Sequence, residues 1–300
     1  MDEILDQLNQ LTLEERNQIR DALDPSKASV KFTSASLVDC TRQDGLGLNL
    51  EHVTGLAYKT IHIPEDFPVP VPSDHLCEQL RRVMAHFAQD HEAARRSVID
   101  AILLEVLESN VDETLKAFCE VKNDWTGSGF GYRGNVDYMI GSARSRSHAT
   151  EDAFILVTQA GNEWPDEAVF QVLAEAGCLL EHRLGVNKNT PVFACLSNGK
   201  FFTFYAIDMD MTVYSSGPEI RLNGGPSRTF KDSSELADIL RWFNWIVTTI
   251  KSLSTPASLL DISASVDDSI IKLRKCFGPE TGNLQRNLNE SLKIVSRIRI

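Results

Sequence analysis

The sequence lacks the long apolar run that a membrane-spanning helix requires. Its apolar stretches, such as 153–157 and 242–250, are short or interrupted by polar residues, whereas a span needs about 20 consecutive apolar residues. The start of the chain, 1–6, is acidic and amphipathic, unlike a secretory signal with its basic first residues and uninterrupted apolar stretch. We therefore expect a soluble intracellular protein, cytoplasmic or nuclear, with no membrane partner.

Several sequence signatures of catalysis and metal binding are also missing. The six cysteines include no CxxC pair, and the seven histidines form neither HxxxH nor HExxH, so the common zinc spacings are absent. No GxSxG nucleophile elbow is present. The glycines of 129–134 match GxGxxG, but no strand-to-helix unit surrounds them and the chain has no HRD or DFG motif. We interpret this segment as a turn that leads into the next strand.

An excess of basic charge is absent too. The chain has 30 Lys and Arg against 42 Asp and Glu, a formal net charge of −12. Because nonspecific binding to nucleic acid depends on contacts between basic side chains and phosphates, this balance argues against an extensive nucleic-acid-binding surface. It leaves room for a local basic groove. Arg144 and Arg146, in the Ser-rich run 141–148, are either part of such a groove or part of a solvated loop.

The hydrophobic pattern that is present divides the chain into three regions. Residues 1–72 predict an N-terminal helical hairpin followed by a connector that ends in the Pro-rich stretch 64–72. Residues 73–255 predict an α/β core, and residues 256–300 predict a C-terminal helical extension. The N-terminal helices are either a lid that packs on the core, which is a purely structural role, or an element that binds a protein partner.

The core region alternates helical and strand-like periodicity. The expected helices are at least two within 73–120, one over 165–184 and one over 233–253. The expected strands cover 132–140, 153–160, 191–196, 200–207 and 211–214, with an Asn-Gly hairpin between the third and the fourth. This order predicts a mixed α/β sandwich in which a central sheet of four or more strands is flanked by helices.

The order of helix, two strands, helix and two strands, with an aspartate in the first strand, resembles the PD-(D/E)XK nuclease superfamily. The metal-binding strand of that family contains a Val-Asp-Tyr run, which Asp137 matches in Asn-Val-Asp-Tyr-Met-Ile. The family's first core helix often carries a glutamate near its start, and Glu92 occupies that place. Alternatively, Glu92 only favours the helix dipole, and Glu105 or Glu108 of the same helical stretch takes the role. Gln171 corresponds to a glutamine that in many members reaches back toward the site. The resemblance covers about 92–253.

The chain departs from the (D/E)XK part of the family motif. Gln159 stands at the acidic position and Gly161 at the lysine position. Phosphodiester hydrolysis needs carboxylates to hold Mg²⁺, which activates water and neutralises charge on the phosphate. Gln159 offers only a neutral oxygen, and Gly161 has no side chain to orient the water. Arg183 or Lys200 could replace the missing lysine, but sequence spacing places neither in the site.

The resemblance implies a restriction-endonuclease-like fold and a candidate site formed by Glu92, Asp137, Gln159 and Gln171. Mg²⁺ is the implied cofactor, held by the first three, and nucleic acid is the implied partner. Asp137 is then a metal ligand of a weak Mg²⁺-dependent phosphodiesterase, a relic in a degenerate pseudo-nuclease, or an unrelated strand residue. The alternative function is a non-enzymatic scaffold whose helical ends recruit protein partners, since a fold alone does not fix a function. The family also implies a fungal origin.

Overall fold

The computed structural model describes most of the predicted core and part of the region before it. The described residues are 28–50, 59–88, 91–110, 115–142, 147, 149–159, 166–188, 190–223 and 229–254. The predicted N-terminal hairpin and the C-terminal extension lie outside these residues, as do Arg144 and Arg146. No helix in the described part of the chain is both long enough and apolar enough to cross a membrane.

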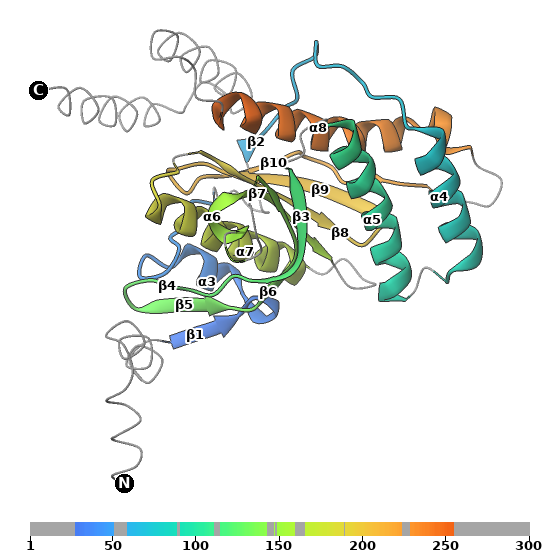
Figure 1. The fold of residues 1–300 in the computed structure, drawn as a ribbon. Helices are drawn as coiled ribbons and strands as arrows, with labels where there is room; N and C mark the ends of the chain where they lie inside the picture. The colour runs from blue at the N-terminus through green and yellow to red at the C-terminus, as the bar shows by residue number, and fades with distance from the viewer. Residues whose placement is uncertain are drawn as a thin grey trace, which may run out of the picture.

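Among the described residues, an eight-stranded mixed sheet forms the centre of the fold (Figure 1). Its strands are β2 (Lys59–Thr60), β3 (Lys116–Lys122), β6 (Asn135–Gly141), β7 (Ala153–Gln159), β8 (Val192–Ser197), β9 (Phe201–Ile207), β10 (Val213–Ser215) and β11 (Ile220–Arg221). They lie in the order β2-β10-β9-β8-β7-β6-β3, with β11 paired to β9. The β7–β8 and β2–β10 pairs are parallel and the others are antiparallel.

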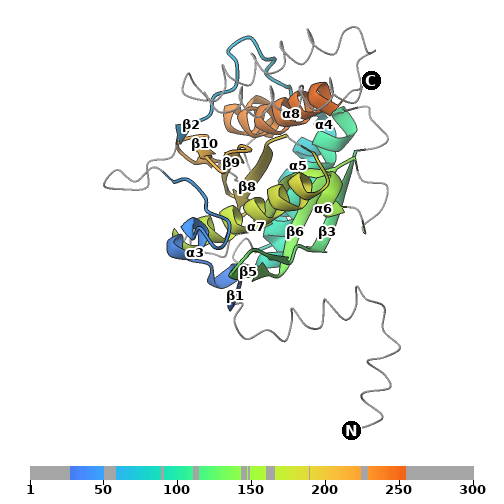
Figure 2. The same ribbon diagram turned by 90° about the vertical axis from the view of Figure 1, so that its left-hand side faces the viewer.

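Helices cover both faces of this sheet, as Figures 1 and 2 show. The helices are α3 (Leu37–Thr41), α4 (Asp74–His86), α5 (Glu92–Ser109), α6 (Ala149–Asp152), α7 (Asp166–Gly185) and α8 (Ser234–Ser254). Residues of α4, α5 and α8 share one hydrophobic core with the sheet, and residues of α3, α6 and α7 share the other. Strand β7 contributes to both cores: Phe154, Ile155 and Val157 belong to the first, and Ala153 and Leu156 belong to the second. Because both faces are buried, β7 and β8 are apolar along most of their length.

A second, three-stranded sheet extends from the start of β6. It consists of β1 (Ala28–Lys31), β4 (Trp125–Thr126) and β5 (Phe130–Arg133) in the order β1-β5-β4. The β1–β5 pair is parallel and the β4–β5 pair is antiparallel. Residues 28–31 and 59–60, which belong to the predicted connector region, therefore contribute one strand to each sheet.

The predicted α/β class and the helix-flanked mixed sheet are confirmed. The predicted helices over 165–184 and 233–253 correspond to α7 and α8, and the Asn-Gly hairpin joins β8 to β9 with Gly199 at φ +76°. That positive φ explains the glycine, since side chains disfavour the left-handed region.

Two predictions of element boundaries are wrong. The helical pattern does not extend to residue 120, because β3 occupies 116–122. This edge strand pairs only with β6 in the described structure and is largely exposed, so it lacks the strong apolar alternation that marks a strand. The single strand predicted over 132–140 is two strands in two sheets, separated at Gly134.

Candidate functional site

Asp137 lies in β6 near the end of the main sheet where the second sheet begins. Its side chain is 21% exposed. Glu120 of the edge strand lies between Cys119 and Val121, whose register partners on β6 are the two neighbours of Asp137. Glu120 has a φ of +52°, so the backbone of β3 is irregular at this point. Two carboxylates from neighbouring strands thus lie side by side at this end of the sheet.

Arg96 of α5 contacts both of these carboxylates. Its Nη2 donates a hydrogen bond to Asp137 Oδ1 at 2.8 Å and another to Glu120 Oε1. Its Nε lies 3.8 Å from Oε1 of Glu92, one helical turn earlier. The bond to Glu120 is the largest of the interactions that raise the pKa of Arg96 above its usual value, and Asp137 adds to it. The guanidinium therefore joins α5 to β3 and β6 through their carboxylates.

A third carboxylate, Glu175 of α7, is fully buried beneath the sheet. Thr158 Oγ1 on β7 donates to Glu175 Oε2, and Gln171 Nε2 donates to Glu175 Oε1 at 2.9 Å. Burial raises the pKa of Glu175 to about 8, and the charge of Asp137 contributes in the same direction, while the two hydrogen bonds oppose the shift. Glu175 is therefore mostly protonated at neutral pH.

The structure brings some of the predicted site residues together. Glu92 and Asp137 both lie near Arg96. Gln171 donates a hydrogen bond to Glu175, and the charge of Asp137 contributes to the raised pKa of Glu175. Gln159 ends β7, and its side chain and Gly161 lie outside the described residues. The predicted site is therefore only partly assembled in the described structure.

Neither proposed substitute for the missing lysine is seen at Asp137. Arg183 donates to the carbonyl of Ala153 at 2.6 Å and to Thr190 Oγ1 at 2.5 Å. Ala153 begins β7, so it lies about 20 Å along the strand from the Gln159 end. Lys200 lies with its Nζ 5.6 Å from the centre of the Phe201 ring.

The sequence contained weak signals for the two residues that were missed. Arg96 follows Glu92 by four residues on a predicted helix, a spacing that favours an ion pair. Glu175 follows Gln171 by four residues and stands within the apolar run of α7. Neither signal indicates that Arg96 and Glu175 both lie near Asp137. They do so because α5 and α7 pack on opposite faces of the sheet, which the sequence of each helix alone does not reveal.

The described residues at Asp137 do not fit Mg²⁺ in this arrangement. The ion takes oxygen ligands, mainly carboxylates and water, in octahedral geometry. Here Asp137 Oδ1 and Glu120 Oε1 accept hydrogen bonds from Arg96, whose fixed positive charge would repel the ion. No group of three or more His, Cys, Asp or Glu side chains within the described ranges is arranged to hold a metal.

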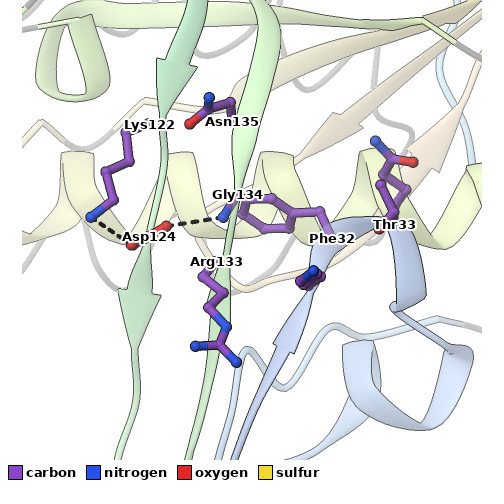
Figure 3. Close-up of a pocket in the computed structure, with 9 residues that line it drawn as sticks. Phe32, Thr33, Lys122, Asp124, Arg133, Gly134 and Asn135 are labelled. Atoms are coloured by element: carbon purple, nitrogen blue, oxygen red, sulfur yellow. Dashed lines mark hydrogen bonds and ion pairs between the residues drawn. The ribbon is translucent and has the colours of Figure 1, made fainter. Parts of the chain in front are cut away.

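A cleft of about 340 Å³ opens beside the start of β6 (Figure 3). Asp124 accepts a hydrogen bond from Gly134 N at 2.9 Å and pairs with Lys122 Nζ at 2.8 Å. Figure 3 shows these two contacts and Arg133 next to Gly134. The lining residues are Lys31, Phe32, Thr33, Lys122, Asp124, Arg133, Gly134, Asn135 and Gln171. This cleft is a local basic surface on an acidic protein.

Comparisons with known proteins assign no family to the chain. No protein-family model matches the sequence, and no curated protein matches it either. The resemblance to PD-(D/E)XK nucleases therefore stays a prediction, to be weighed against the arrangement of charges around Asp137.

Proposed function

We propose that the chain is a nuclease-like domain of the PD-(D/E)XK type that is catalytically degenerate and acts by binding nucleic acid. The order of elements supports this proposal, since α5 precedes β6 and β7, α7 follows them, and the β8–β9 hairpin comes next. The positions of Glu92 at the start of α5 and Asp137 in β6 support it as well, because both lie near Arg96.

The observation that carries the proposal is the position of Arg96 between Asp137 and Glu120. In a metal-dependent nuclease a divalent cation balances such carboxylates and lowers the pKa of its bound water. A guanidinium balances the same charge but has no ligand position for water, and it stays protonated at any pH at which proteins fold. The arrangement therefore conserves the charge balance of a metal site without its means of activating water.

Calorimetric titration of Mg²⁺ and Mn²⁺ tests the proposal. We expect no metal binding by the wild-type chain and no cleavage of single- or double-stranded DNA or RNA. The matched variant is Arg96→Gln, which removes the cation while Asp137 and Glu120 remain. Uptake of Mn²⁺ by this variant, and its loss in Arg96→Gln combined with Asp137→Ala, is the expected result.

An active enzyme would give a different pattern. Metal-dependent cleavage by the wild-type chain, abolished by Asp137→Ala, would show that a metal can displace Arg96 from the carboxylates. It would contradict the proposal that the site is degenerate. The alternative function, a scaffold that recruits protein partners through its helical ends, concerns segments outside the described residues. It predicts no binding of any nucleic acid in a fluorescence anisotropy titration.

A further inference from the structure

Two basic side chains lie next to each other at the cleft beside β6. Lys31 and Arg133 are register partners in the parallel β1–β5 pair, and both are exposed. Neighbouring strands are about 4.8 Å apart, so the two basic residues leave the sheet from adjacent backbone positions. Within the described ranges neither side chain forms an ion pair with a carboxylate. Like charges placed side by side on neighbouring strands repel each other, and an anion between them would relieve the repulsion.

The one carboxylate in the cleft lining does not cancel this pair. Asp124 uses one oxygen to accept from Gly134 N at 2.9 Å and the other to pair with Lys122 at 2.8 Å. Its charge is therefore balanced locally by Lys122. The lining contains three cations and one carboxylate, which leaves two positive charges in excess.

We propose that this cleft binds a phosphate monoester, with Lys31 and Arg133 contacting its oxygens. Arg133 supplies a planar guanidinium that can bond two phosphate oxygens at once, and Lys31 supplies a compact charge. The Thr33 hydroxyl and the Asn135 amide, which also line the cleft, supply neutral donors. The volume of about 340 Å³ is at the lower end of the range for small-molecule sites.

Charge matching favours a monoester over a diester. A phosphate monoester carries about −1.5 to −2 at neutral pH, which matches the two unbalanced cations. A diester in a nucleic-acid backbone carries one negative charge and would leave one cation unbalanced. This inference goes beyond the proposed function, because it does not require the Asp137 cluster to be a relic of a metal site.

Calorimetric titration of inorganic phosphate into the full chain tests the site. At about pH 7.5 and low ionic strength, where a phosphate monoester is mainly doubly charged, we expect saturable binding by the wild type. Lys31→Gln and Arg133→Gln should each weaken binding roughly tenfold, the loss expected for one charge-assisted hydrogen bond. Lys116→Gln is the matched control, since this exposed lysine begins β3, about 20 Å along the strand from Lys122.

Two results would overturn the proposal. One is the absence of uptake by the wild type at millimolar phosphate. The other is an equal effect of Lys116→Gln and the two cleft variants, which would indicate a general effect of net charge. Thermal unfolding gives an independent measurement: phosphate should raise the Tm of the wild type more than potassium chloride of equal ionic strength, and this difference should be smaller in Lys31→Gln.

A pair of single-stranded oligonucleotides distinguishes the sources of phosphate. One strand carries a 5′-phosphate and the other a 5′-hydroxyl. Tighter binding of the phosphorylated strand, lost in Arg133→Gln, supports a monoester site that can accept a strand end. Equal binding of both strands, weakened in the same variant, would contradict the monoester and assign the cleft to backbone diesters.

Discussion

Two polar centres near the start of β6 differ in how their charges are balanced. At Asp137, the Arg96 guanidinium bonds to carboxylates of two strands, and the protonated Glu175 lies buried behind them. At the cleft, Lys31 and Arg133 lie side by side with no carboxylate paired to them within the described ranges. The first centre therefore holds elements of the fold together, whereas the second presents charge to solvent.

The difference shows why acidic residues in a motif are poor evidence of catalysis by themselves. A carboxylate that is already bonded to a guanidinium contributes to packing, and a ligand must displace that partner before it can bind. Exposed cations have no such competition, although water and salt screen them. A binding function is therefore better supported at the cleft, and the Asp137 cluster is better understood as a structural centre.

The largest expected effect concerns the buried end of the first centre. The pKa of Glu175 is about 8 in the folded protein, against an ordinary value of 4.5. Between these values the folded state holds a proton that the unfolded state has released, so stability is greatest at low pH and falls as pH rises toward 8. The full difference corresponds to roughly 5 kcal/mol. Chemical denaturation across this pH range should show the decline in the wild type.

Glu175→Gln removes the titrating group while it keeps the shape of the side chain. The variant should lose most of the decline in unfolding free energy between about pH 5 and 8, because an amide has no proton to release there. Glu219→Gln is the control, since Glu219 is exposed, and it should retain the wild-type profile. A variant at position 175 with the same slope as the wild type would show that Glu175 is ionised in the folded protein.

A smaller effect is expected at Gly134, where the two sheets meet. Its φ is +150°, and a Cβ there would lie 2.8 Å from Cδ2 of Phe32. Gly134→Ala should therefore destabilise the protein by about 1–3 kcal/mol, through backbone strain and displacement of the Phe32 ring. It should also weaken phosphate binding, because Phe32 lines the cleft. Denaturant unfolding and calorimetry measure the two effects.

The control for this substitution is Gly185→Ala at the end of α7. A Cβ at Gly185 meets no atom within 4 Å, and its φ is not in the positive range. Replacing a helical glycine by alanine gives a change of about 0.4–1 kcal/mol toward greater stability. If both alanine variants were equally stable, the contact between Gly134 and Phe32 would not determine the shape of the cleft.

The elements that could be predicted from the sequence are those whose local signals agree with their environment. The long apolar pattern of α7 and the Asn-Gly turn at 198–199 each specify one structure. The edge strand β3 could not be predicted, because an exposed strand carries little apolar alternation and its pairing with β6 depends on distant residues. The sequence did not predict that the strand over 132–140 is divided at Gly134, because the residues on both sides have the composition of a strand.

The candidate site was predictable only in part for a similar reason. The motif located Asp137 and Glu92, but it gave no sign that Arg96 would bond to Asp137. The basic cleft was not predicted at all, since Lys31 and Arg133 are about 100 residues apart and become neighbours through a parallel strand pair. Parallel pairing requires a long connection, so sequence proximity carries no signal for it.

The smallest expected effect on stability is at Lys122, and it separates the two centres most sharply. Its pair with Asp124 is exposed, with 76% and 39% of the two side chains accessible, so Lys122→Gln should change the free energy of unfolding by less than about 1 kcal/mol. The same variant leaves Asp124 unbalanced in the cleft and should weaken phosphate binding several-fold, as calorimetry would measure, whereas Lys116→Gln should alter neither quantity. A reduced affinity for phosphate with an unchanged free energy of unfolding would show that the charge of Lys122 contributes to ligand binding and not to the stability of the fold. A large loss of stability with unchanged affinity would instead place Lys122 with Arg96, among the charges that hold the fold together.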